Sequence, residues 1–304
     1  MNNSKVNSIE TGTVFTEDNV EITWTSHGQG QPIYCCNGVG VSTFFWKYIV
    51  RDFHEHFRII TWDYRGHGSS QRNLSVEQQD LSIARHAQDL KILMDELTPD
   101  ARSILIGHSM GCQVSLEFQI QFPASVKSLI LLLGTAGRAL ETFGDNPLSP
   151  YIFKVIHRVT HRIGSQINLY TSALVKSRIA WPFTKKFQLV DPLYTDREDF
   201  QPYLDHLASM DMLTFTDAIL ACHQHDAWPM LSDIQVPVLV FAAERDTFTP
   251  IHCSESIAQT LPKGEIMILA DGSHAALIEQ PDTISHRVRR FIQEHHLNGD
   301  QPLQ

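Results

Sequence analysis

Short apolar runs alternate along the chain with longer stretches whose apolar positions recur every three or four residues. The first pattern is typical of strands in a parallel sheet covered on both faces, and the second is typical of amphipathic helices. The alternation predicts an α/β fold with a doubly wound, mostly parallel sheet. The expected strands are 33–36, 58–62, 103–106, 127–133, 238–242 and 265–269, and the expected helices are 83–97, 110–121, 252–261 and 283–295.

Two segments depart from this alternation. Residues 13–16 and 21–25 alternate in polarity around a turn, which predicts an N-terminal antiparallel hairpin and about eight strands in all. Strand signals are missing from 135–228, so we expect a helical cap there, inserted into an α/β core formed by 1–134 and 229–304. Such a cap would exclude water from a site and shape its pocket.

Composition narrows the class of protein. The chain has 304 residues, of which 42% are hydrophobic and 19% charged, as in ordinary globular proteins. Its formal net charge of -10 argues against a nucleic-acid partner, because phosphate binding requires clustered Lys and Arg. No apolar run approaches the roughly 20 residues of a membrane span, and the N-terminus lacks the apolar core of a signal peptide. Irregularly spaced cysteines favour reduced thiols in a cytoplasmic protein; they are Cys35, Cys36, Cys112, Cys222 and Cys253.

The strand expected at 103–106 ends in Gly107-His108-Ser109-Met110-Gly111, and a helical pattern follows directly. In this strand–turn–helix context, Gly-x-Ser-x-Gly predicts a nucleophile elbow. The turn would hold Ser109 in a strained backbone conformation. Gly107 and Gly111 would be required where neighbouring chain passes closely.

A serine hydroxyl becomes a nucleophile when a base removes its proton and a third group orients that base. His274 follows the strand expected at 265–269, and Asp246 follows the one at 238–242. Both therefore lie at the same end of the sheet as Ser109, and we expect these three residues to be catalytic. Weaker candidates for the acid are Glu244, Asp145 and Asp271.

The loop Asn37-Gly38-Val39-Gly40 follows another expected strand. Its glycines would let the Val39 N–H point into the site, where it would form an oxyanion hole with the Met110 N–H. A dinucleotide-binding loop is the competing interpretation, but its third glycine would fall at Thr43. We expect neither a nicotinamide nor a flavin, and no other cofactor.

Together these motifs resemble the α/β-hydrolase superfamily, specifically its capped esterase and lipase-like branch, over most of 13–134 and 236–295. The stretch 63–70, DYRGHGSS, is similar to an Asp-x-Arg-Gly-x-Gly-x-Ser loop that is structural in most members, which implies that His67 is not catalytic. The segment from Gly272 to Pro281 is similar to the family's catalytic-histidine segment. Two departures are Asn37, where many members have His, and Cys112, where many have Gly.

These observations lead us to expect a serine hydrolase that cleaves a small-molecule carboxylic ester through an acyl-enzyme. The same triad could instead run acyl transfer, perhydrolysis or carbon–carbon bond hydrolysis. A slow or non-catalytic small-ligand receptor on the same fold is a further alternative. The sequence makes no prediction of the oligomeric state.

The expected cap is basic. No acidic residue lies between Asp145 and Asp191, and one face of the stretch 152–163 is apolar. A lid helix with its apolar side on the pocket is the interpretation we favour; contact with an anionic membrane, or attraction of an anionic substrate, is the alternative. The basic residues are Lys154, Arg158, Arg162, Lys176, Arg178, Lys185 and Lys186.

Two histidine pairs have spacings that metal ligands can show. His157 and His161 are four residues apart, and His223-x-His225 precedes Asp226. The sequence offers neither pair a recognisable further ligand, so we expect no metal.

Overall fold

The computed structural model describes residues 9–178, 180–186, 190–191 and 195–297. Within these residues one eight-stranded sheet has the order β1-β2-β4-β3-β5-β6-β7-β8. The β1–β2 and β2–β4 pairs are antiparallel and every other pair is parallel, which confirms the expected fold class. The strands are β1 (Ile9–Phe15), β2 (Glu21–His27), β3 (Gln31–Cys36), β4 (Phe57–Trp62), β5 (Ser103–His108), β6 (Val126–Leu132), β7 (Val238–Ala243) and β8 (Gly264–Leu269).

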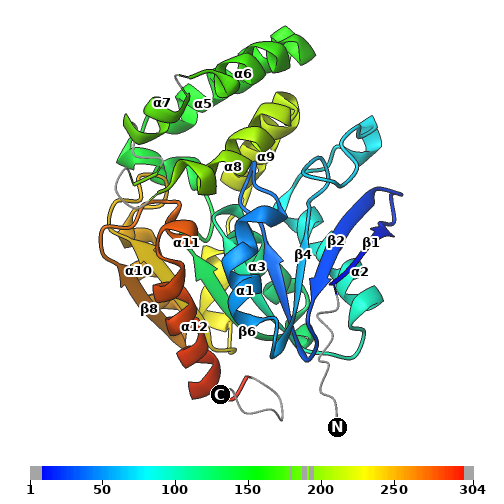
Figure 1. The fold of residues 1–304 in the computed structure, drawn as a ribbon, viewed down its shortest axis with the longest axis vertical. Coiled ribbons are helices and arrows are strands. Elements are labelled where there is room, and N and C mark those ends of the chain that lie inside the picture. Colours follow the sequence, from blue (N-terminus) through cyan, green and yellow to red (C-terminus); the bar gives the residue numbers. More distant parts are fainter. Residues whose placement is uncertain (1–8, 179, 187–189, 192–194, 298–304) are drawn as a thin grey trace.

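Helices cover both faces of the sheet, because successive side chains of a buried strand point to opposite sides. Tyr34 and Cys36 on β3 belong to one core layer, whereas Ile33 and Cys35 belong to the other. The first layer packs against α2 (Ile83–Leu97), α3 (Met110–Gln121) and α10 (Ile251–Thr260). The second packs against α1 (Lys47–Phe53), α11 (Ala276–Glu279) and α12 (Pro281–Glu294) (Figure 1).

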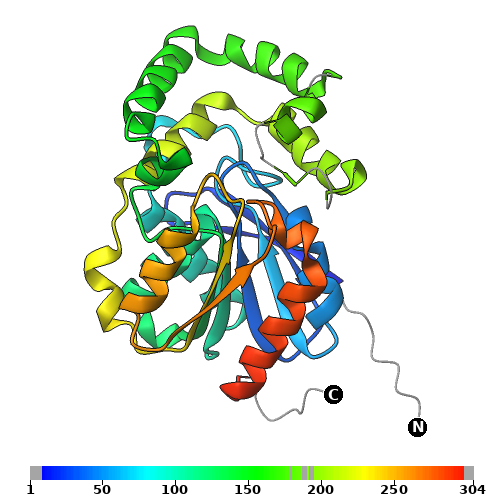
Figure 2. The ribbon, with the colours of Figure 1, turned by 90° about the vertical axis from the view of Figure 1, so that its left-hand side faces the viewer.

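Between β6 and β7 the described chain forms helices and no strand, in the interval where a cap is expected. Both views show these helices stacked over one end of the sheet (Figures 1 and 2). They are α4 (Ala139–Thr142), α5 (Ser149–Ile163), α6 (Ile167–Lys176), α7 (Ala180–Lys186), α8 (Arg197–Ser209) and α9 (Met212–Gln224).

Helix α5 turns only part of its apolar face toward the interior. Ile152 and Ile156 line the cavity described below, yet each remains about half exposed. Val155, Val159 and Ile163 are exposed and do not line it. The favoured expectation of an apolar side resting on the pocket is therefore right for Ile152 and Ile156 only. No helix in the described parts of the chain has the length and hydropathy of a membrane span.

Candidate active site

Ser109 lies between the last residue of β5 and the first residue of α3. Its backbone has φ 55° and ψ -116°, which a non-glycine residue adopts only under constraint. The two flanking glycines are sterically required. A Cβ on Gly111 would lie 2.0 Å from the Cys36 carbonyl oxygen, and one on Gly107 would lie 2.3 Å from the Gly111 carbonyl oxygen. The local packing therefore has the features expected of an elbow.

The structure brings the three residues expected to be catalytic into one hydrogen-bonded chain. Nε2 of His274 lies 3.0 Å from Oγ of Ser109, and Nδ1 of His274 lies 2.8 Å from Oδ2 of Asp246. An ionised carboxylate only accepts hydrogen bonds, so Nδ1 carries the proton and Nε2 is left to accept the serine O–H. The arrangement prepares Nε2 to act as a base toward the Ser109 hydroxyl.

Asp246 is held rigidly by the loop after β7. Its side chain is fully buried and accepts hydrogen bonds from the Phe248 N–H (2.8 Å), the Thr249 N–H (3.0 Å) and the Thr249 hydroxyl (2.8 Å). Burial alone would raise the pKa of Asp246, but the charge of His274 and the hydrogen bonds from His274 and Thr249 outweigh it. The pKa of Asp246 is therefore below its ordinary value, and the carboxylate is ionised at neutral pH.

The other candidate acids have different partners. Glu244 accepts a hydrogen bond from the Asp271 N–H at 3.1 Å, and Asp271 forms an ion pair with Arg245. Asp145 lies 3.8 Å from Nε2 of an exposed histidine, His252. Asp246 is therefore the carboxylate that the fold presents to His274.

His108, the residue before Ser109, is a site residue that the sequence did not reveal. Its Nε2 donates a hydrogen bond to the His274 carbonyl oxygen at 3.0 Å, because a carbonyl can only accept. Burial, together with the charge of His274, lowers the pKa of His108 to about 3, so the ring is neutral at neutral pH. The interaction joins positions 166 residues apart, and no local pattern encodes it.

Glu279 is the second residue that the sequence did not assign. Its carboxylate accepts hydrogen bonds from the N–H (3.0 Å) and the hydroxyl (2.6 Å) of Ser273, directly before His274. It also accepts from the Asp191 N–H and the Thr195 hydroxyl, each at 2.7 Å. One buried carboxylate thus ties the loop that carries His274 to Asp191 and Thr195.

The expected oxyanion loop lies against the nucleophile. The Asn37 side chain is anchored in the core: it donates to the Trp62 carbonyl oxygen (2.7 Å) and accepts from the Trp46 indole (2.6 Å). A Cβ on Gly38 would lie 3.3 Å from the Cβ of Ser109, and Gly40 has a φ of +67° that favours glycine. The loop thereby holds its Gly38–Gly40 segment beside the elbow.

Val39 and Met110, the two expected oxyanion donors, both line the same cavity as Ser109. Met110 is the first residue of α3, so its N–H has no acceptor within that helix. Among the described residues the Val39 N–H makes no hydrogen bond to another loop or turn carbonyl. Both groups are therefore available to a ligand oxygen.

The cavity above Ser109 has a volume of about 630 Å³. It lies between the carboxyl end of the sheet and the helices that follow β6. The ionisable side chains among its described lining residues are those of His108, His274, Tyr203 and Cys222. No Asp, Glu, Lys or Arg is among them, so the cavity offers no fixed charge to a bound ligand. Its walls are largely apolar; they include Phe45, Leu140, Phe143, Phe153, Phe215, Ile219 and Phe248.

The remaining motifs have structural partners outside this cavity. Arg65 is buried against Asp89 and also pairs with Asp18, and burial lowers the pKa of the neighbouring His67 to about 4. His225 lies 3.0 Å from the Glu117 carboxylate, and Asp226 pairs with Arg138.

All five cysteines are buried, and none forms a disulfide. His157 and His161, by contrast, share a carboxylate from another helix, Asp217.

Comparison with known proteins identifies proteins that are similar to this chain. A family model described as the alpha/beta hydrolase fold matches residues 31–281. The chain is 24% identical to a putative carbamate hydrolase RutD of Agrobacterium fabrum over 272 residues, which are 90% of this chain and 97% of the relative. It is 26% identical to a protein of the same name from Pseudomonas savastanoi, with the same coverage.

Solved structures agree in fold. A thermophilic esterase from Thermogutta terrifontis has a TM-score of 0.73 at 20% identity, covering 94% of this chain and 99% of that one. An enol-lactonase from Burkholderia xenovorans has a TM-score of 0.69 at 20% identity, covering 90% and 97%. The family-model match spans most of the chain, and the sheet order and the elbow agree with it. This chain therefore belongs to the α/β hydrolase fold family.

Proposed function

We propose that this protein is a serine hydrolase that cleaves neutral carboxylic esters with an apolar acyl group. The observation that carries the proposal is the hydrogen-bonded chain from Ser109 through His274 to Asp246, at the base of a largely apolar cavity without fixed charge. In this geometry the adjacent base activates the serine hydroxyl, and a third group orients that base.

In the first half-reaction Ser109 Oγ attacks the ester carbonyl carbon while Nε2 of His274 takes the hydroxyl proton. Asp246 stabilises the resulting imidazolium, since its carboxylate remains ionised and hydrogen-bonded to Nδ1. Negative charge develops on the former carbonyl oxygen, and the Val39 and Met110 N–H groups would donate to it. One such donor is typically worth about 3 kcal/mol in the transition state.

Collapse of the tetrahedral intermediate breaks the ester bond. The leaving alcohol takes the proton from His274, and the acyl group stays on Ser109. A water molecule then attacks the acyl carbonyl, with His274 as the base, and the same oxyanion contacts stabilise the second intermediate. Release of the carboxylic acid restores the serine hydroxyl.

The cavity supports the choice of substrate. Its volume of about 630 Å³ is in the range of pockets that hold drug-sized ligands, and its walls are aromatic and aliphatic. An apolar acyl chain would bury its surface there, whereas a charged substrate would lose hydration without gaining an ion pair.

Carbamate hydrolysis is the second candidate, favoured by the name that several relatives carry. The chemistry at Ser109 would be the same for both substrates. They differ in charge and size: the cavity would hold an apolar acyl group in one case and a small carbamate anion in the other. The uncharged lining favours an ester over a small carbamate anion. Assays of aryl esters beside aryl carbamates with the same leaving group separate the two, and adding alcohol or peroxide as a competing nucleophile tests for acyl transfer and perhydrolysis.

The direct test is a panel of chromogenic esters of increasing acyl length with the Ser109→Ala variant. We expect turnover to fall by roughly 10⁶ in Ser109→Ala, as in other triad knockouts, with an unchanged melting temperature. Ser149 provides a matched control because it lines the same cavity but donates its hydroxyl to the Phe143 carbonyl oxygen. Ser149→Ala should keep most of the activity. A Ser109→Ala protein with near-wild-type turnover would refute the assignment.

We also propose that the protein is cytoplasmic. Its five buried, unpaired thiols support this, because extracellular proteins of this kind commonly oxidise cysteines in pairs.

A further inference from the structure

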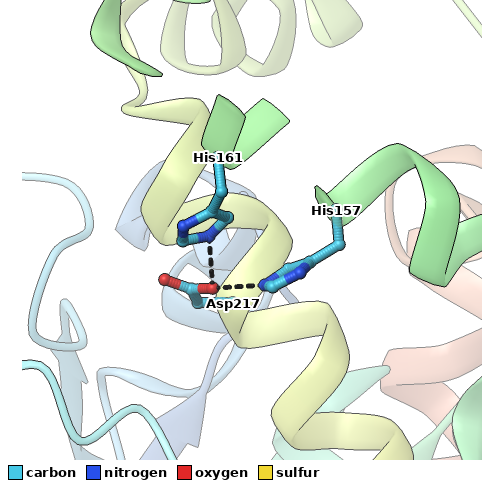
Figure 3. A group of neighbouring side chains, drawn as sticks. All are labelled: His157, His161 and Asp217. Atoms are coloured by element: carbon cyan, nitrogen blue, oxygen red, sulfur yellow. Dashed lines mark hydrogen bonds and ion pairs between the residues drawn. The ribbon is translucent and has the colours of Figure 1, made fainter. Parts of the chain in front are cut away.

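A cluster of two histidines and one aspartate joins two helices above the cavity. His157 and His161 are on α5, and Asp217 is on α9. Nε2 of His157 lies 2.7 Å from Oδ1 of Asp217, and Nε2 of His161 lies 2.8 Å from the same oxygen. Figure 3 shows both rings directed at this carboxylate. The three ligand atoms lie within 4.8 Å of one another.

We propose that His157, His161 and Asp217 form a binding site for one divalent transition-metal ion of the zinc class. The donor types and their number support this, since zinc takes imidazole nitrogen and carboxylate oxygen and commonly keeps a fourth position for water. Two histidines four residues apart on one helix present their rings on the same face.

The spacing of the ligand atoms also fits. Ligands bonded tetrahedrally at about 2.0 Å lie about 3.3 Å from one another, so the N–O separations of 2.7 and 2.8 Å need to open by only about half an ångström. On binding, each imidazole would move its proton from Nε2 to Nδ1, and the ion would occupy the freed lone pairs. All three side chains are partly exposed, so an ion can enter from solvent.

The charges and ligand types around the cluster favour a transition-metal ion over calcium or magnesium. The neighbouring exposed residues of α5 include Lys154 and Arg158, whose positive charge disfavours a cation held by charge alone. Calcium and magnesium depend on several oxygen ligands, and this cluster offers one carboxylate. Zinc, nickel and copper gain their affinity from imidazole coordination and tolerate such surroundings better.

Binding would affect the shape of the cavity. Ile152, Phe153 and Ile156 of α5 line it, and so do Phe215 and Ile219 of α9. The metal ligands alternate with these residues: His157 follows Ile156, and Asp217 lies between Phe215 and Ile219. An ion bound by both helices would fix the separation of α5 and α9 where they line the cavity.

The test adds zinc alone to the full-length protein after chelator treatment and desalting. We expect one equivalent in calorimetry and in metal analysis, and a rise in melting temperature of about 4 °C at saturation. His161→Gln and Asp217→Asn should each weaken binding at least tenfold, whereas His286→Gln, an exposed histidine on α12, should not. Cobalt in place of zinc should give visible bands of four- or five-coordination in the wild type and in His286→Gln, but not in His161→Gln or Asp217→Asn.

Failure to bind, or equal binding by wild type and Asp217→Asn, would overturn the metal site. These measurements do not depend on esterase activity, so their outcome is independent of the proposed function. A melt of each apo variant establishes that it is folded.

A second observation on the same helices points to a lipid surface. Sixteen large hydrophobic side chains are exposed among the described residues, and ten of them fall between Leu148 and Leu174. Tyr151 and Val155 on α5 and Leu169 and Tyr170 on α6 are each more than half exposed. Such a concentration exceeds the scattered apolar residues of an ordinary surface.

The charged side chains on α5 and α6 themselves are all basic. No acidic residue occurs between Asp145 and Asp191, while Lys154, Arg158 and Arg162 are exposed on α5. Apolar side chains flanked by basic ones match the boundary of a bilayer with anionic headgroups. Ile152 and Ile156 are both exposed and in the cavity wall, so the apolar surface continues toward Ser109. We infer that α5 and α6 dock on an anionic membrane.

Co-sedimentation with phosphatidylserine–phosphatidylcholine vesicles tests this inference. We expect binding at low salt, weaker binding at high salt, and little binding to phosphatidylcholine alone. The double variant V155S/V159S should lose most of the binding, while I266S/I268S, a pair of similar exposure on β8, should keep it. The absence of binding to anionic vesicles would overturn the inference. So would a wild-type dimer in light scattering that V155S/V159S converts to a monomer, since a second copy would then cover this surface.

Discussion

The imidazole of His108 donates a hydrogen bond to the backbone carbonyl oxygen of His274 at 3.0 Å, and the centroids of the two imidazole rings lie 5.1 Å apart. His108 thus positions the base from the backbone side, while Asp246 orients it through the ring. Both contacts limit the movement of Nε2 relative to Ser109.

Loss of this contact should affect turnover more than binding. In His108→Phe we expect kcat to fall about tenfold with little change in KM, because a buried carbonyl loses its donor and the base is less well placed. Steady-state kinetics on a short ester measures this. His108→Gln can donate from a similar position and should recover most of the rate. An unchanged kcat in the Phe variant would show that the contact has no role in positioning.

Asp246→Asn should lower kcat by roughly 10⁴ without unfolding the protein. The amide oxygen can still accept from the Phe248 and Thr249 N–H groups, but the amide N–H₂ would face Nδ1 and favour the wrong tautomer of His274. Kinetics and a thermal melt of the same sample check both parts. Asp145→Asn, at the rejected acid, should retain wild-type turnover.

Stability should fall in mild acid because buried histidines are neutral in the folded state. Burial lowers the pKa of His67 to about 4 and that of His108 to about 3, and it lowers that of His86 well below the ordinary value. The unfolded chain therefore binds protons first as the pH drops below about 6.5. Each buried histidine lowers the free energy of unfolding by about 1.4 kcal/mol per pH unit in this range. The loss stops when the pH reaches the pKa of that histidine in the folded protein.

Urea unfolding at several pH values between 7.5 and 4.5 measures this slope. Stability should be greatest near neutral pH and decrease steadily toward acid. His86→Phe should give a shallower dependence of stability on pH, because phenylalanine binds no proton in the unfolded chain. The substitution removes no hydrogen bond, since neither nitrogen of His86 has a partner in the described structure. A free energy of unfolding that stays flat over this range would contradict the buried neutral state.

Gly111→Ala should prevent correct folding of the elbow. Its Cβ would lie 2.0 Å from the Cys36 carbonyl oxygen, a backbone atom that cannot move without disturbing β3. We expect a loss of several kcal/mol or no folded protein. Gly164→Ala is the control: nothing lies within 4 Å of its Cβ, and its positive φ should cost about 1 to 2 kcal/mol. Chemical denaturation compares the two.

Glu279→Gln should destabilise the loop of His274. Glutamine has one acceptor oxygen and would turn its N–H₂ toward groups that donate, such as the Ser273 N–H. We expect a decrease of about 2–3 kcal/mol in the free energy of unfolding, as for other hydrogen bonds to buried charge. Glu96→Gln, exposed on α2, should leave stability unchanged. Equal melting curves for the two variants would contradict the anchoring role of Glu279.

Local patterns predicted much of the core. The bounds expected for 83–97 and 110–121 coincide with those of α2 and α3. Helix α2 starts after the capping residue Ser82 and has one apolar face, whereas α3 starts directly after the elbow and is buried on most sides. The short helix α1, Lys47–Phe53, was not predicted, since seven residues are too few for a periodic signal. The placement of Ser109, Asp246 and His274 at one end of the sheet also followed from sequence, as each lies in the loop or turn that follows an expected parallel strand.

Tertiary structure alone decided what surrounds these residues. The hydrogen bond from His108 to His274, the anchoring of Ser273 by Glu279 and the meeting of Asp217 with two histidines each join distant parts of the chain. Sequence periodicity shows which face of a helix is apolar, but not what that face meets; α5 leaves Val155 exposed. The reason is physical: hydrophobic periodicity and turn chemistry act over a few residues, whereas side-chain partners depend on how whole helices and strands pack.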